Sequence, residues 1–286
     1  MQLPANLANI SVDQDWQHAA PYPPLGFTPF YEGALGNGDT FGLYWPIGRE
    51  ASEPIVVETW HDEGRLQPHF SSLAAFLQGY AAADEEYVGT PALADDPDSP
   101  RAAFLEAKDL IARQNPAAAI ALLEAALARL PEYTDALALL HGQYVRAGRT
   151  DEAVKVAIQA IISPPSFGGP PLKALHWLRK QPLPDTQHDP IWRACGQLSL
   201  SFGGSKDNAD YPVLLAAIDT YLEQGNERCA STLMQTYAEL MFAETVSFQE
   251  RYGFDAAAFI ARQIAVGARL AHGGRDASGL CWPDMA

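Results

Sequence analysis

Apolar side chains recur at every second position over residues 40–47, where Phe41, Leu43 and Trp45 fall on one face of an extended chain. This period of two is typical of a β-strand with one buried face. Residues 55–60, with the sequence IVVETW, predict a second strand because they are rich in β-branched and aromatic side chains. The sequence GNGD at 36–39 contains Asn-Gly, which favours a hairpin turn before the first strand.

The period then changes to that of a helix. Ser72 is a typical N-cap residue, and the apolar residues at positions 73, 76, 77 and 80 share one helical face. We therefore expect a small α+β domain with an antiparallel sheet over residues 1–83. Residues 84–100 are rich in acids and prolines and lack an apolar period, so they predict a linker.

From residue 101 onward the pattern is helical and repeats with a period of 34 residues. Small and large positions of 100–133 recur in 134–167, where small residues let paired helices approach and a proline ends the second helix. The period breaks over 168–210, returns over 211–244, and a final helix is expected at 255–271. This predicts an all-α domain over 101–286. The corresponding pairs are Ala107/His141, Leu110/Tyr144, Ala119/Ala153, Leu123/Ala157, Ala126/Ala160 and Pro131/Pro165.

Charge is distributed unevenly along this acidic chain. The net charge of the 286 residues is −16, of which residues 1–100 contribute −13, with Arg49 and Arg65 as their only basic residues. Nucleic acid is not expected as a partner, because binding to phosphates requires a basic face. The acidity indicates either a well-solvated N-terminal surface or one that attracts a basic partner.

Cysteines and hydropathy indicate a cytoplasmic protein. Cys195, Cys229 and Cys281 are far apart, which fits a reducing compartment. The N-terminus lacks the features of a signal peptide, and no apolar run reaches the length of a membrane span. We expect no membrane association.

His61, Asp62, Glu63 and His69 are the residues that invite a metal interpretation. Their spacing matches no standard metal site, so we expect no metal and no cofactor. No nucleophile, base or acid carries a local catalytic signature either, and we expect a protein that is not an enzyme.

The order of motifs over residues 27–80 resembles the C-terminal part of the SUKH superfamily. The shared features are a glycine-rich turn, two strands, an acidic turn and a helix that begins at Ser-Ser-Leu. The resemblance implies a SUKH-like α+β fold and a role in binding, because many bacterial members are immunity proteins that neutralise toxins, often nucleases. The matching residues are Gly36, Asn37, Gly38, Asp39, Gly42, Pro54, Val56, Val57, Phe70, Ser71, Ser72, Leu73, Phe76 and Leu77.

The 34-residue period resembles the tetratricopeptide repeat at its small, large and proline positions, and RAGRTDEAVKVAIQAII (146–162) is the best match. The resemblance implies a concave groove that binds a peptide or a protein surface. The alternative is a short stack that only enlarges the protein. The implied groove positions include Arg101, Phe104, Lys108, Ile111, Asp135, Ala138, Gly142, Val145 and Arg146.

Two functions compete at this point. The first is an immunity protein that occludes the active site or substrate surface of a cognate toxin, expected to be a basic nuclease domain. The second is a scaffold or adaptor that docks partners on the helical repeats. For the first function, side chains of the N-terminal domain would supply aromatic anchors and acidic steering. These side chains are Asp39, Trp45, Trp60, Asp62 and Glu63.

Overall fold

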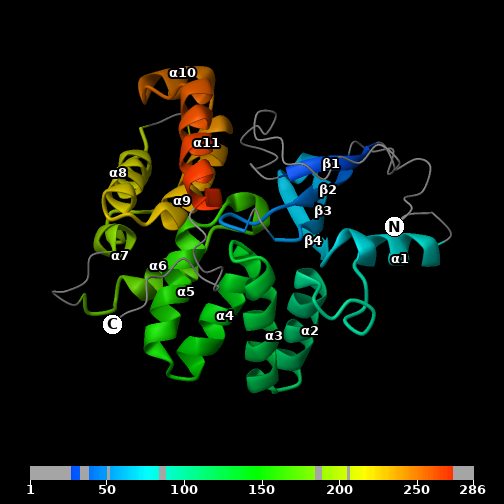
Figure 1. Cartoon of the computed structure of the whole chain (residues 1–286). Coiled ribbons are helices and arrows are strands. Elements are labelled where there is room, and N and C mark those ends of the chain that lie inside the picture. Colours follow the sequence, from blue (N-terminus) through cyan, green and yellow to red (C-terminus); the bar gives the residue numbers. More distant parts are fainter. Residues whose placement is uncertain are drawn as a thin grey trace. The chain divides into compact units, whose positions relative to one another are not determined.

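The computed structural model describes residues 27–32, 39–49, 52–83, 88–183, 189–204 and 207–272. Within them a small antiparallel sheet is followed by a series of helices, which confirms the predicted α+β class (Figure 1). The elements are β1 (Phe27–Glu32), β2 (Thr40–Tyr44), β3 (Ile55–Trp60), η2 (His61–Glu63), β4 (Arg65–Phe70), α1 (Leu73–Ala82), α2 (Pro100–Ala112), α3 (Pro116–Arg129), α4 (Thr134–Arg146), α5 (Thr150–Ile162), η3 (Pro165–Phe167), α6 (Leu172–Leu178), α7 (Pro190–Ala194), α8 (Asp210–Glu223), α9 (Glu227–Phe242), α10 (Val246–Arg251) and α11 (Ala256–His272).

The sheet has the order β1-β2-β3-β4, with every neighbouring pair antiparallel. Leu43 is paired with Val56, and Val56 with Phe70, so large apolar residues line up across three strands. The expectation of one exposed face on β2 is wrong. Residues 41–44 of β2 and 55–59 of β3 are all buried, because these central strands are covered on both faces.

Helix α1 covers one face of the sheet. It begins after Ser72, whose Oγ accepts a hydrogen bond from the Ala75 amide at 3.2 Å, as expected of an N-cap. The ring of Phe76 on α1 lies 5.1 Å from that of Phe41 and 5.5 Å from that of Phe70, measured between centroids. These aromatic contacts form the centre of the small core of the sheet.

The two outer strands, β1 and β4, were not predicted. Each contains a proline, Pro29 or Pro68, which interrupts the apolar pattern and is tolerated at the edge of a sheet. The antiparallel pairing of β1 with β2 is what the expected hairpin requires. The turn residues 33–38 themselves lie outside the described residues.

The predicted 34-residue repeat corresponds to two pairs of helices. Helices α2 and α3 form one pair, α4 and α5 form the next, and corresponding helices begin 34 residues apart. Helices α8 and α9 form a further pair at the position of the third expected repeat.

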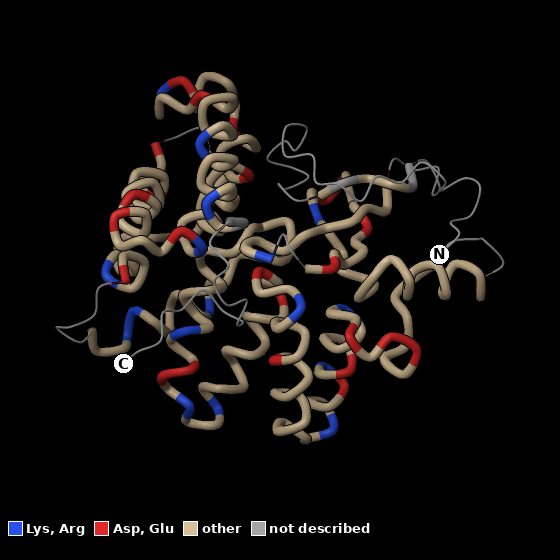
Figure 2. The backbone as a smooth tube through the Cα atoms, in the orientation of Figure 1, with Lys and Arg blue, Asp and Glu red and all other residues tan. Residues whose placement is uncertain are grey.

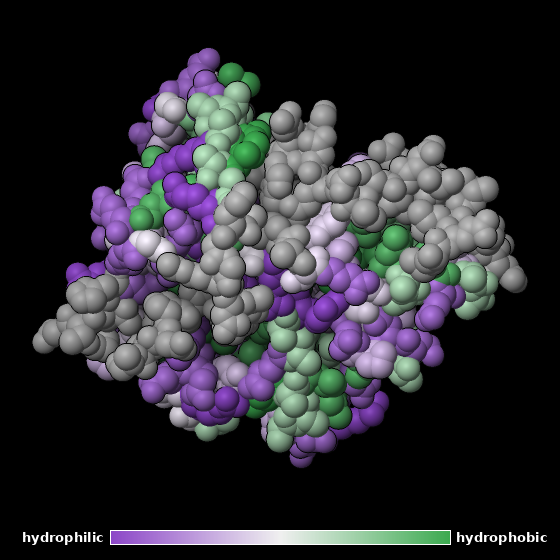
Figure 3. Space-filling view, viewed as in Figure 1, coloured by the Kyte–Doolittle hydropathy of each residue, from purple (hydrophilic) through white to green (hydrophobic). Residues whose placement is uncertain are grey.

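In Figure 3 the pale green strip below the centre is α3, where Ala117, Ala121 and Ala125 are exposed.

Residues 163–209 interrupt the repeat with shorter elements. The helices α6 and α7 of this segment pack against α5, and their side chains join one apolar core with α8, α9 and α11. Within this core, Trp192 of α7 and Tyr221 of α8 are buried. Cys195 and Cys229 are buried free thiols in the same core, and Cys281 lies outside the described residues.

The chain divides into two compact units, Met1–Pro131 and Glu132–Ala286. This division lies beyond the predicted linker 84–100, and the structure shows why the two differ. The acids of 95–98 precede α2 (Figure 2), yet Asp96 Oδ2 accepts a hydrogen bond from the Ser71 amide at 2.8 Å. Ser99 Oγ donates to the His69 carbonyl, and α2 packs on β4. The described part of the acidic stretch is therefore bound to the sheet.

Candidate functional site

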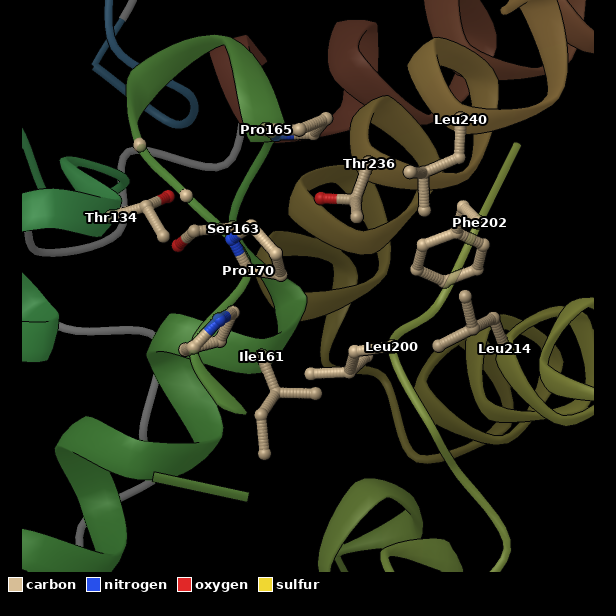
Figure 4. A pocket seen from close by; sticks show the side chains of 13 residues that line it. Thr134, Ile161, Ser163, Pro165, Pro170, Leu200, Phe202, Leu214, Thr236 and Leu240 are labelled. Carbon is tan, nitrogen blue, oxygen red and sulfur yellow. The ribbon is translucent and has the colours of Figure 1, made fainter. Parts of the chain in front are cut away.

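An apolar pocket of about 240 Å³ lies in the second unit (Figure 4). One wall is the segment that follows α5, whose sequence SPPSFGGPP (163–171) is too rich in proline and glycine to continue a helix. The opposite wall comes from the segment before α8 and from α9. The lining residues are Thr134, Ile161, Ser163, Pro165, Gly168, Gly169, Pro170, Pro171, Leu200, Phe202, Leu214, Thr236 and Leu240.

The start of α4 holds the proline-rich wall in place. Thr134 Oγ1 donates to the Pro164 carbonyl at 3.0 Å, and Asp135 Oδ1 accepts from the Gly169 amide at 3.1 Å. Gly168 approaches this helix so closely that a Cβ at its position would lie 2.5 Å from the Asp135 nitrogen. The pocket therefore requires glycine at 168 for lack of space.

Glu239 of α9 also holds the proline-rich wall in place. Its carboxyl group accepts hydrogen bonds from the Ser166 amide at 3.0 Å and from Ser166 Oγ at 3.1 Å. Gln235 Nε2 donates a third hydrogen bond at 2.7 Å. Burial raises the pKa of Glu239 to about 7, against the opposing effect of these three donors.

The opposite wall is also fixed by a buried acid. Asp210, at the start of α8, accepts hydrogen bonds from the amides of Ser199 at 2.8 Å and Leu200 at 2.6 Å. Further along, Glu244 Oε1 accepts from the Gly203 amide at 3.0 Å and from Tyr211 Oη at 2.8 Å. Leu200 and Phe202 are thus held between two anchored points.

The hydroxyl groups that line the pocket are already hydrogen-bonded within the protein. Ser163 Oγ donates to the Gln159 carbonyl at 2.7 Å, and Thr236 Oγ1 donates to the Ile162 carbonyl at 2.5 Å. Thr134 is engaged as described above. Because the remaining lining side chains are hydrocarbon, the pocket offers carbon surface and suits an apolar group.

A hydrogen-bonded series of polar side chains lies in the first unit and connects the sheet to the segment before α2. Arg101 Nε donates to Thr90 Oγ1 at 3.0 Å, which leaves the Thr90 hydroxyl to donate to His69 Nδ1 at 2.8 Å. His69 Nε2 then donates to Glu58 Oε2 at 2.8 Å. Trp60 Nε1 donates to the same carboxylate oxygen at 3.0 Å, and the Arg101 guanidinium lies 5.5 Å from the centre of the Trp60 ring.

This hydroxyl–imidazole–carboxylate series has the same order of groups as a hydrolase triad. However, the side chains of His69 and Glu58 are only 3% and 2% exposed, and the Thr90 hydroxyl is occupied by Arg101. Burial lowers the pKa of His69, while Glu58 opposes this effect, so the imidazole is held neutral within the network. We assign the series a structural role that joins residues 90–101 to the sheet.

The histidines and acids that invited a metal interpretation are divided between different environments. His61 contacts Asp39 Oδ1 through its Nδ1 and through its amide, both at 2.8 Å, and this hydrogen bond raises the pKa of His61. His69 lies in the buried series instead. Among the described residues, no three potential ligands are grouped so that they could hold a metal ion.

The structure places the partner-binding residues of the sequence interpretation in several environments. Trp45 is 5% exposed and belongs to the core of the sheet, and Asp39 is also buried and is hydrogen-bonded to His61. Trp60 and Arg101 are brought together by a cation–π contact, as are Phe104 and Lys108. Asp135 is the one residue of the set beside the pocket. The exposed members are Asp62, Glu63, Lys108, Asp135 and Arg146, and Phe104 is half-buried with Lys108 over its ring.

Sequence reasoning did not identify the pocket. The signal available was the stretch 163–171, which interrupts the repeat with four prolines and two glycines. The other wall residues are separated from it by 29 to 77 positions along the chain, from Leu200 to Leu240. No local pattern indicates that such distant segments meet.

The fold and the repeats together define a class: a helical-repeat protein that carries a small N-terminal sheet domain. The family described as tetratricopeptide repeat matches residues 110–165, the YfbP N-terminal domain matches residues 12–88, and the YfbP C-terminal domain matches residues 201–275. A protein of Escherichia coli (strain K12) with the name "Uncharacterized protein YfbP" is 38% identical over 258 residues, covering 89% of this chain and 92% of that protein. The chain therefore belongs to the YfbP family.

No solved structure matches the chain. The SUKH superfamily is not among the matched families, so that resemblance stays a prediction. In the part of the chain that the structure describes, no helix combines the length and apolarity needed to cross a bilayer.

Proposed function

We propose that this protein is a non-catalytic adaptor that binds a segment of a partner protein in the apolar pocket of its second unit. The observation that supports this most directly is the pocket of about 240 Å³, whose lining hydroxyl groups are all hydrogen-bonded internally. An apolar side chain of a partner would gain from burial there without leaving a polar group unsatisfied. Tetratricopeptide-like repeats commonly serve as protein-binding scaffolds, which agrees with this role.

The fixed walls favour binding over catalysis. Glu239 and Asp135 hold one wall, and Asp210 holds the other, so the pocket exists before a ligand arrives. A preformed site loses little conformational entropy on binding, and this improves affinity. The lining offers neither a nucleophile with an adjacent base nor a group that titrates.

Photo-crosslinking from the edge of the pocket tests this function. Phe202 is half-buried. It is replaced by the photo-reactive residue benzoylphenylalanine in the full chain, which is expressed in cells of the organism that the protein comes from. We expect a cross-link to a defined protein, whose attachment point is mapped by mass spectrometry to one segment. The matched control is the same replacement at Phe242, which is 51% exposed on α9 but does not line the pocket. Equal products from both positions, or no product from Phe202, would contradict the proposal.

A second proposal is that the partner is a cognate toxin, so that the protein confers immunity. The observation that favours it is the net charge of −13 on residues 1–100, which suits a basic nuclease domain. If a neighbouring gene encodes such a toxin domain, we expect one-to-one binding whose association rate falls as salt is raised. Survival of cells that co-express the two proteins, and death of cells that express the toxin alone, would support immunity. Absence of binding and of protection would exclude it.

A further inference from the structure

We infer that the pocket of the second unit binds an aromatic or branched aliphatic side chain from a partner segment in which Lys or Arg lies next to that side chain. This inference rests on the proposed adaptor function and specifies the chemistry of the partner. It depends on three features: the size of the pocket, the shape of its walls and the charges beside it.

The size of the pocket suits one large side chain. A dry apolar cavity of about 150 Å³ accommodates benzene. A volume of about 240 Å³ therefore provides room for a phenyl or an indole ring, or for a leucine or isoleucine side chain with space to spare.

The walls present flat or branched hydrocarbon. Figure 4 shows Pro165, Pro170 and Ile161 on one side and Phe202, Leu214 and Leu240 on the other, with Leu200 between them. Proline rings and a phenylalanine ring provide flat surfaces on which an aromatic side chain packs well. A polar or charged side chain would lose its hydration here and find no free hydrogen-bonding hydroxyl in return.

Two carboxylates are hydrogen-bonded to residues of the pocket walls. Asp135 is exposed and accepts a hydrogen bond from the Gly169 amide, and Glu244, two residues after the end of α9, accepts one from the Gly203 amide. The 13 lining residues include no Lys or Arg. Carboxylates on two sides of an apolar pocket favour a ligand whose anchor side chain is flanked by basic residues.

The same charges argue against a second copy of this chain as the occupant. Each copy has a net charge of −16, so two copies repel each other at low ionic strength. A basic segment of a different protein gains from the attraction that a second copy lacks. We therefore assign the pocket to a foreign basic and apolar segment.

Selection of peptides from a random dodecapeptide display library on the purified full chain tests the inference. We expect the selected peptides to contain Phe, Trp, Leu or Ile next to Lys or Arg. The highest-ranked peptide is then synthesised with a fluorescent label, and its affinity is measured by anisotropy. Replacement of its anchor by Ala, or of its basic residues by Glu, is expected to weaken binding about tenfold or more.

Variants of the protein assign that binding to the pocket. Leu240→Lys introduces a cation into the wall and is expected to lower the affinity for the peptide about tenfold or more. Phe242→Lys, on the same helix, is expected to leave the affinity for the peptide unchanged. Asp135→Asn keeps the acceptor for the Gly169 amide but removes the charge, and is expected to weaken binding about two- to fivefold. Asp151→Asn, at an exposed acid on α5, is the control. Thermal melting of each variant confirms that it is folded.

The outcomes separate this inference from the adaptor function. Selected peptides that lack basic residues or an apolar anchor, or that bind Leu240→Lys as tightly as the parent, would overturn the partner chemistry. In that case a cross-link from Phe202 would still support the adaptor function. Self-association in sedimentation experiments that Leu240→Lys abolishes would identify a second copy as the occupant and overturn the inference. If neither the cross-link nor any selected peptide is obtained, both proposals fail.

Discussion

Gly168 illustrates how a single residue without a side chain determines the shape of the pocket wall. A Cβ at this position would lie 2.5 Å from the Asp135 nitrogen and 2.7 Å from Thr134 Cβ, both of which belong to the rigid start of α4. We predict that Gly168→Ala lowers the free energy of unfolding by about 2 kcal/mol or more, because the wall must move to relieve the clash. Urea denaturation followed by circular dichroism measures the change.

The control for this substitution is Gly142→Ala, which also adds one methyl group to a glycine of the second unit. Apart from its chain neighbours and the adjacent backbone of α4, no heavy atom lies within 4 Å of a Cβ at position 142, which is inside that helix. Alanine is the better helix former, so this variant should gain about 0.5–1 kcal/mol. Similar losses in both variants would show that crowding at 168 is not the cause.

His141 predicts a pH dependence of stability at the residue scale. It is 5% exposed, its ring lies 5.0 Å from that of Trp177, and burial lowers its pKa to about 4 from 6.5. Between these two values the unfolded chain binds a proton that the folded chain excludes, so stability falls as the pH decreases through this window. We expect a loss of about 1–2 kcal/mol, reduced from the full shift by partial solvent screening.

His141→Leu isolates this contribution. Urea denaturation near pH 7 and near pH 4.5 should show a smaller loss for the variant than for the parent. The difference between the two proteins is decisive, because Glu239 acts in the opposite direction. Its pKa is raised to about 7 from 4.5, so its contribution decreases as the pH rises. Parallel curves for the two proteins would refute the assignment to His141.

At the scale of elements, one turn geometry joins the helices of each pair. Gly148 and Gly225 follow the first helix of their pairs with φ of 71° and 72°, and Gln114 occupies the corresponding place with φ of 62°. The following amide reaches back to the helix in each case, as between Asn115 N and the Leu110 carbonyl at 2.8 Å. A side chain is unfavourable in this left-handed conformation, so glutamine carries a cost that glycine avoids.

We predict that Gln114→Gly raises the free energy of unfolding by about 0.5–1 kcal/mol. The reciprocal change, Gly148→Gln, should lower it by a similar amount. Chemical denaturation of both variants measures the pair. A stability change of the same sign in both would indicate that the left-handed turn is not the determining factor.

At the scale of the whole molecule, the first two repeat helices belong with the sheet. The Ser71 amide donates a hydrogen bond to Asp96 Oδ2 at 2.8 Å. The Ser71 carbonyl accepts one from Arg129 Nη2 at 2.6 Å. Ser99 and Thr90 engage both ends of His69, at its carbonyl and its ring. The compact unit therefore extends to Pro131 and includes α2 and α3.

We predict that a fragment of residues 1–131 folds cooperatively, whereas a fragment of residues 1–100 does not. Removal of α2 and α3 takes away Arg129, which donates to the buried Ser71 carbonyl, and Arg101, which donates to Thr90 in the His69 series, and it exposes apolar surface of β4. Thermal unfolding of both fragments by circular dichroism distinguishes them. Equal, cooperative transitions would place the boundary in the linker 84–100 instead.

Much of the secondary structure follows from local patterns that the sequence contains. The alternation of Phe41 and Leu43, the β-branched run 55–60 and the N-cap Ser72 each specify one element through contacts between near neighbours. The 34-residue period likewise specified the helix pairs, because each pair buries the same small and large positions. The outer strands β1 and β4 escaped prediction because their prolines mask the pattern and only pairing with β2 and β3 makes them strands.

The sequence by itself thus determined the central strands, the capped helix α1, the paired helices and the final helix, and that the chain is acidic and repetitive, whereas α6, α7 and α10 were not predicted. Only the tertiary structure decided that Trp45 is a core residue, that Glu58 and His69 are tied to the segment before α2, and that 163–171 meets α8 and α9. The physical reason is the range of the interactions. Helix and strand periods arise from backbone geometry over a few residues, whereas a pocket forms where the side chains of distant segments pack together.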